Sequence, residues 1–131
     1  MQLVSTDENR NLLMEDSDVT VTIDSTLSDP NLKIIAIKGT VDRETSFRVD
    51  KKVLPLIEQD DAHIILDLTN LDYLSNVGMM SIVKYSVLCC DKKKLFKIVN
   101  PPISVQDNMA VFGILNKFDM YDNIEAAIST F

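Results

Sequence analysis

The stretch LDYLSNVGMM, residues 71–80, connects a predicted buried strand to a predicted buried helix. The run AHIILDL before it, residues 62–68, is almost continuously apolar, as is typical of a strand inside a sheet. The residues from about 77 to 90 are apolar over most of a helical circumference. A strand that ends in a short loop and opens a helix presents backbone N–H groups and the positive end of the helix dipole to solvent. This loop therefore suits an anion, a nucleotide phosphate or a phosphorylated side chain.

The overall composition is that of one soluble globular domain. The chain has 131 residues, of which 46% are hydrophobic and 25% charged. No apolar run approaches the roughly 20 residues of a membrane-spanning helix, and the acidic, polar start does not resemble a secretory signal. We therefore expect a cytoplasmic protein without a membrane span.

Charge and residue usage argue against several function classes. Residues 1–29 carry seven acidic residues and one basic residue, so most of the net charge of −7 lies there, and no basic field for nucleic acid remains. The adjacent Cys89 and Cys90 and a single histidine, His63, offer neither a disulfide nor a zinc site. With three glycines and no glycine-rich phosphate motif, we expect no cofactor and no catalytic residue.

Hydrophobic periodicity predicts alternating strands and helices. Strands are expected at 18–27, 32–38, 62–68, 95–99 and 118–121, and helices at about 42–57, 77–90, 101–112 and 122–131. The order β-β-α-β-α-β-α-β-α predicts an α/β fold with a mixed, mostly parallel five-stranded sheet and about four helices. Residues 1–17 are expected to be a flexible acidic segment before a domain at 18–131, although the apolar residues 12–14 leave a docking role open.

Several local features sharpen this prediction. Residues 39–42 should end the second strand, and Pro55 should kink or shorten the helix after it. Residues 92–94, three lysines, are expected to form a solvated turn, and Asp122 with Glu125 resembles a capping box. The segments 39–42 and 75–78 both follow strands, so they should lie on the same rim of the sheet.

Three segments in this order resemble the STAS domain, the family of bacterial anti-sigma-factor antagonists. Residues 39–45, G-x-V-D-x-x-T, are similar to the family's G-x-[LI]-D-x-x-[TS], and residues 73–79, YLSNVGM, to its F-[IM]-D-S-[ST]-G-[LI]. The segment from Val105 through Gly113 and Phe118 to Ala127 is similar to its V-x-x-x-L…G-L…F-x-x-[YF] tail. The resemblance covers about residues 18–131.

This resemblance implies a non-catalytic module of transcription regulation and signal transduction. Its expected partner is an anti-sigma factor that is also a serine kinase, and the module itself is expected to be a monomer or weak dimer. In the family, phosphorylation of the second Ser or Thr of D-S-[ST]-G ends the binding. A phosphate adds roughly −1.5 to −2 charges, which a helix N-terminus tolerates and a partner shaped for a neutral hydroxyl does not.

The sequence departs from the family at this decisive position. Ser75 occupies the position of the family's Asp, Asn76 that of its first Ser, and Val77 that of the phosphorylated Ser or Thr. Valine has no hydroxyl, so the resemblance implies a partner bound constitutively or under the control of another component. Alternatively, the acceptor has moved to Ser75 or Ser81, or the chain is an accessory subunit of a stressosome-like or lipid-transport assembly.

The expected partner-binding residues follow from the first two motifs. They are Asp42, Arg43, Thr45, Ser75, Asn76, Val77, Gly78 and Met79, with Ser75 also the candidate phosphorylation site and no metal ligand among them. For most of these a purely structural role is the alternative. Asp42 and Ser75 are good helix caps, Arg43 and Thr45 can be ordinary first-turn residues, and Met79 can belong to the core.

Overall fold

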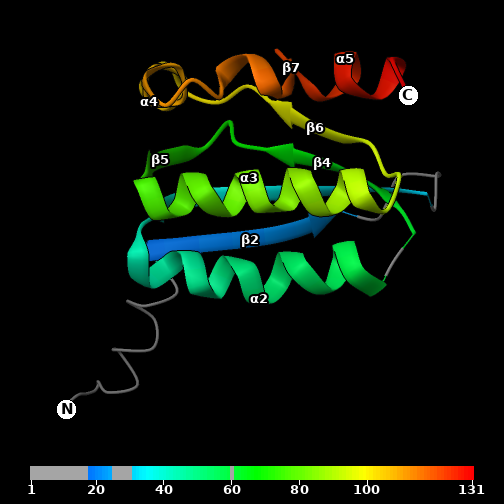
Figure 1. Ribbon diagram of the computed structural model, residues 1–131, viewed down its shortest axis with the longest axis horizontal. Coiled ribbons are helices and arrows are strands. Elements are labelled where there is room, and N and C mark those ends of the chain that lie inside the picture. The colour runs from blue at the N-terminus through cyan, green and yellow to red at the C-terminus, as the bar shows by residue number, and fades with distance from the viewer. Residues whose placement is uncertain (1–17, 25–30, 60) are drawn as a thin grey trace.

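A computed structural model describes residues 18–24, 31–59 and 61–131, and alternation of strands and helices is its main feature (Figure 1). The prediction for residues 1–17, and the last three residues of the strand predicted at 18–27, lie outside these described residues. The strands are β2 (Val19–Asp24), β3 (Leu32–Val41), β4 (His63–Asp67), β5 (Leu71–Leu74), β6 (Phe96–Val99) and β7 (Asp119–Tyr121). The helices are α2 (Arg43–Gln59), α3 (Asn76–Asp91), α4 (Ile103–Val111), the 3-10 turn η1 (Leu115–Lys117) and α5 (Ile124–Ser129).

The strands form one mixed sheet, as the sequence predicts. Its order is β2-β3-β4-β6-β7, with β2 antiparallel to β3 and the other pairs parallel. Parallel neighbours need a crossover connection, which the intervening helices supply. The fold class is therefore confirmed, and within the described residues the sheet contains six strands where periodicity predicts five.

The additional strand, β5, lies inside the stretch that periodicity predicts to be a loop. It pairs in parallel with the end of β3, so β4 and β5 follow one another along the same side of β3. The expected break at residues 39–42 was wrong, because β3 continues to Val41 through an irregularity between Gly39 and Thr40. Gly39 has a φ of 101°, and a Cβ there would lie 2.4 Å from the carbonyl oxygen of Asp18, so only glycine fits this bend.

The helices begin and end close to their predicted positions, with two differences. Helix α2 continues past Pro55 to Gln59, so the proline does not shorten it. The cap of α5 is Asn123, whose side chain accepts the backbone N–H of Ala126, in place of the expected Asp122. Gly113, with a φ of 73°, follows α4 as a terminating glycine should.

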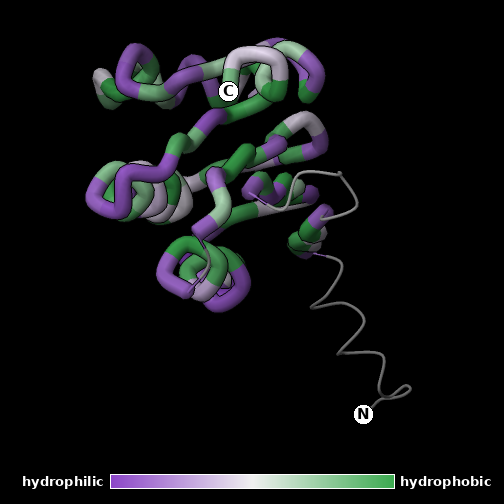
Figure 2. Tube along the Cα trace, turned by 90° about the vertical axis from the view of Figure 1, so that its right-hand side faces the viewer, coloured by the Kyte–Doolittle hydropathy of each residue, from purple (hydrophilic) through white to green (hydrophobic). Residues whose placement is uncertain are grey.

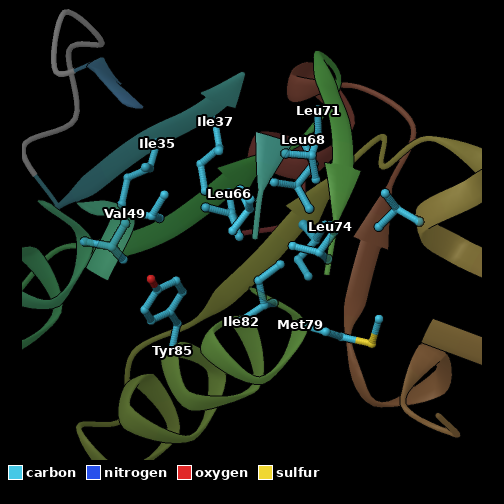
Figure 3. Packing of buried hydrophobic residues seen from close by; sticks show 14 of the residues in the cluster. Ile35, Ile37, Val49, Leu66, Leu68, Leu71, Leu74, Met79, Ile82 and Tyr85 are labelled. Atoms are coloured by element: carbon cyan, nitrogen blue, oxygen red, sulfur yellow. The ribbon is translucent and has the colours of Figure 1, made fainter. Parts of the chain in front are cut away.

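Apolar side chains pack on both faces of the sheet. Figure 2 marks the hydrophobic residues along the chain in green, and Figure 3 shows part of the larger cluster. Successive strand residues point to opposite faces, so Ile35 packs under α2 and α3 whereas Ile34 packs against α5. Val49 from α2 and Ile82 and Tyr85 from α3 point into the larger cluster. The helices α2 and α3 thus lie on the same face of the sheet, next to each other.

Polar contacts connect α2 to α3 and to the turn that follows α3. Asp50 on α2 receives hydrogen bonds from the hydroxyl of Tyr85 and, at 3.0 Å, from the ammonium of Lys84. Lys94 is buried and donates to the backbone carbonyls of Leu56 and Ile57 near the end of α2, at 3.3 and 3.0 Å. The prediction of a solvated turn is thus wrong for Lys94, which stabilises the C-terminal end of a helix.

Candidate functional site

The first part of the candidate site is the turn from β3 into α2. The Asp42 carboxylate accepts the backbone N–H groups of Glu44 and Thr45 at 3.0 and 2.9 Å. In return, the Thr45 hydroxyl accepts the N–H of Asp42 at 2.8 Å and donates to the carbonyl of Thr40 at 2.7 Å. This is a reciprocal cap, and the N–H of Thr45 is the main reason that the pKa of Asp42 lies below its usual value.

The second part is the start of α3. Ser75 is the N-cap residue, and its hydroxyl accepts the N–H of Gly78 at 3.1 Å. The N–H of Ser75 donates to the carbonyl of Val41 at 2.8 Å, so the two turns are joined directly. The prediction that they share one rim is confirmed, and we call residues 41–43 and 75–78 the rim.

The rim depends on Gly78 for this close approach. A Cβ at Gly78 would lie 2.7 Å from side-chain atoms of Leu74 and Val41 and 3.1 Å from the Val41 carbonyl oxygen. The start of α3 therefore rests against the end of β3 with no room for a larger residue.

The expected site residues divide into an exposed and a buried set. Arg43, Asn76 and Val77 are exposed, and Asp42 and Ser75 are half-buried. Thr45, Gly78 and Met79 are buried, with Met79 pointing into the core (Figure 3). The buried three thus form the scaffold that holds the exposed ones.

An apolar groove between α2 and α3 opens beside the rim. It is lined by Ser46, Phe47, Asp50, Val77, Met80, Ser81 and Lys84, and we call it the α2–α3 groove. Phe47 and Met80 are each 61% exposed and Val77 is 41% exposed. The helical patterns at 42–57 and 77–90 did not predict either Phe47 or Met80 as a surface residue.

The charge of Asp50, which lines the groove, is balanced by neighbouring side chains. Burial, followed by the neighbouring Asp50 carboxylate, raises the pKa of Tyr85 far above its usual range, so its hydroxyl stays protonated and donates to Asp50. Lys84 balances the charge of that carboxylate. The groove thus offers an apolar surface with one satisfied ion pair.

The remaining reactive residue types lie away from the rim. His63 stands at the start of β4, where its Nδ1 accepts the N–H of Leu95 and its ring stacks on Phe131. Cys89 is buried, and burial raises the pKa of its thiol to about 11. Among the described residues, no group of His, Cys, Asp or Glu could hold a metal ion. Nor does any described helix have the length and apolar character needed to cross a membrane.

Comparison with known proteins identifies the family. The STAS domain model matches residues 23–127. The chain belongs to the STAS domain family. A search of curated proteins finds no match.

Solved structures of STAS proteins share the fold. An anti-sigma factor antagonist from Mycobacterium paratuberculosis has a TM-score of 0.70 at 14% identity, covering 86% of this chain and 92% of that one. The antagonist SpoIIAA in its unphosphorylated form has a TM-score of 0.71 at 15% identity, covering 85% and 95%. The phosphorylated form of SpoIIAA, a Bacillus cell fate determinant, has a TM-score of 0.68 at 17% identity, covering 85% and 98%. At these low identities, the likeness shows a shared fold.

Proposed function

We propose that this STAS domain is a non-catalytic cytoplasmic regulator that binds an anti-sigma factor with serine kinase activity. The binding surface is the rim together with the α2–α3 groove, and position 77 does not act as a phosphoacceptor. The observation that carries this proposal is the exposure of Phe47, Val77 and Met80 around one groove beside the rim. Clustered exposed apolar side chains, bordered by polar residues, are typical of protein interfaces.

The missing hydroxyl at Val77 supports binding that this chain does not switch off itself. SpoIIAA exists in an unphosphorylated and a phosphorylated form. Here, the Ser75 hydroxyl is occupied as the helix cap, and Ser81 is only 7% exposed. Neither serine is as accessible as Val77. We therefore favour the loss of the phosphoacceptor over its transfer to Ser75 or Ser81.

A matched pair of substitutions tests the binding surface. Val77 and Val87 are the same residue type on the same helix, and both are exposed, but only Val77 lines the groove. A glutamate at an interface position must be desolvated opposite apolar groups, which we expect to cost about 2 kcal/mol or more, roughly a 30-fold loss of affinity. Calorimetric titration with regulatory kinases encoded near this gene should show that loss for Val77→Glu and little change for Val87→Glu. Equal affinities for the two variants, or no binding by the unaltered chain, would refute the proposal.

A second experiment tests the phosphoacceptor. When the chain is incubated with a bound kinase and ATP, mass spectrometry should detect no phosphate between residues 73 and 81. The variant Val77→Ser restores a hydroxyl at the exposed position and should be phosphorylated there. Phosphate on Ser75 or Ser81 of the unaltered chain would contradict the claim.

An accessory role in a larger assembly is the second candidate, and three exposed apolar residues of the α4 region favour it. Ile103, Val111 and Phe112 lie on or directly after α4 and are all exposed, with Val111 at 83%. Size-exclusion chromatography with light scattering separates the candidates. A stable large homo-oligomer would favour the accessory role, and a monomer the kinase-binding regulator.

A further inference from the structure

The first described residue, Asp18, lies at the rim end of the sheet. In the antiparallel pairing of β2 with β3, Val19 stands opposite Gly39, two residues before β3 ends at Val41. The start of β2 consequently lies at the same end of the domain as the start of α2 (Figure 1). The seventeen residues that precede Asp18 are therefore tethered next to the rim.

The surface between that tether and the groove changes from basic to apolar. A shallow pocket between β2 and α2 is lined by Val19, Thr20, Val21, Arg48 and Lys52. About 100° round α2 from Lys52, the ammonium of Lys51 lies 4.6 Å from the centre of the Phe47 ring. Phe47 in turn forms one wall of the α2–α3 groove. A chain crossing α2 from β2 thus meets positive charge first and apolar side chains second.

The sequence before Asp18 has the complementary order. Glu15 and Asp16 come first when the chain is followed backwards, and the apolar residues 12–14 come next. Six Cα-to-Cα steps lead from Leu12 to Asp18, and at no more than about 3.6 Å per step they can span about 20 Å. A helix with its side chains is roughly 10–12 Å wide, so residues 12–14 can reach across α2 to the groove.

We propose that residues 12–16 bind to their own domain, with Glu15 and Asp16 against Arg48 and Lys52 and residues 12–14 in the α2–α3 groove. The chain then covers the apolar surface that a partner uses, and the partner must displace it. A tethered segment acts at an effective concentration in the millimolar range, so even weak intrinsic affinity keeps the groove largely occupied. Competition with a partner rests on the function proposed above, whereas the intramolecular contact does not.

Methionine methyl signals in the full-length chain provide the test. A nitroxide is attached at Arg10→Cys in a Cys90→Ser background, because Cys89 is buried and Cys90 is the exposed native thiol. With ¹³C-methyl methionine, the Met80 signal reports on the groove, and the Met120 signal, on the edge strand opposite β2, is the internal control. The Met80 signal should lose most of its intensity to paramagnetic broadening, and the Met120 signal should keep its intensity.

The matched variant replaces Leu12, Leu13 and Met14 with serine and keeps the label, the length and the charge. It should restore the Met80 signal and bind the partner several-fold more tightly than the unaltered chain. A sharp Met80 signal in the nitroxide-labelled chain with residues 12–14 intact, or broadening that survives the triple substitution, would overturn the inference. The methyl experiment contains no partner, so its outcome is independent of whether the proposed kinase binding is correct.

Discussion

Substitution of Gly78 by alanine probes the contact on which the rim depends. The added Cβ would lie 2.7 Å from Cδ1 of Leu74 and 2.7 Å from Cγ1 of Val41, closer than side-chain carbons approach one another. Leu74 and Val41 are both buried, and the Val41 carbonyl oxygen lies 3.1 Å away. The start of α3 must therefore move away from β3, which also strains the hydrogen bond from Ser75 to Val41.

Two opposing terms set the size of the effect. Inserting a methyl group into a tightly packed site costs about 2–3 kcal/mol, whereas exchanging Gly for Ala in a helix stabilises by at most about 1 kcal/mol. The net loss is therefore about 1–2 kcal/mol of unfolding free energy. For a chain of this length, 1 kcal/mol corresponds to roughly 4 °C, so the midpoint should fall by about 4–8 °C.

Thermal and urea unfolding followed by circular dichroism measure this loss, and a double-mutant cycle assigns its cause. In a Val41→Ala background, Cγ1 is absent, so Gly78→Ala should cost about 1 kcal/mol less than it does in the unaltered chain. If Gly78→Ala were as stable as the unaltered chain or more stable, helix propensity would dominate and the close-packing argument would be wrong. Strict additivity in the cycle would equally exclude Val41 as the obstacle.

Two further predictions concern the caps and the thiols. Asp42→Ala should lower the unfolding free energy by about 1 kcal/mol at neutral pH, because it removes the helix cap. The pKa of Asp42 is depressed in the folded chain, so the difference from the unaltered chain should shrink as the pH falls through that pKa. A pH-independent difference in urea unfolding would contradict this prediction. With a chromogenic disulfide reagent near neutral pH, the native chain should react rapidly at Cys90 alone, because Cys89 is buried and its thiol pKa is about 11. The substitution Cys90→Ser should abolish the fast phase of this reaction. A fast phase that survives the substitution would show that Cys89 is accessible.

Elements with a strong local signal were predictable from the sequence. The apolar runs of β3 and β4 and the alternation in β2 gave the correct strands, and their order gave the fold class. The meeting of the two turns at one rim followed from parallel topology alone, and the contact between Ser75 and Val41 confirms it. These features depend on periodicity and connection rules, which a single sequence contains.

Features that depend on tertiary packing were not predictable in the same way. The four residues of β5 do not alternate between apolar and polar as a half-buried strand does. Their pairing with β3 also includes an irregularity of β3 between Gly39 and Thr40, which the sequence alone does not reveal. Glycine there indicated a break, because sequence alone does not distinguish a bulge from a strand end. The N-cap of α5 is Asn123, one residue after the predicted Asp122. This difference depends on the residue at which β7 ends.

The exposure of Phe47 could have been found with a stricter reading of helical phase. Val49, Val53 and Ile57 recur every four residues and are all buried. Phe47 precedes Val49 by two residues, which places it about 200° round the helix from that apolar stripe. An aromatic residue so far out of phase indicates a surface anchor, whereas Met80, in an almost wholly apolar helix, gives no such signal.

The contacts of Asp50 and Lys94 bear on how this domain can acquire new partners. Lys84 and Tyr85 fix the two walls of the groove to each other at Asp50, and Lys94 attaches the chain after α3 to the far end of α2. The backbone of the groove is thus held independently of the side chains at positions 47, 77 and 80. Under the proposed function, substitutions at those three positions would change which protein is recognised while the framework of the groove stays intact.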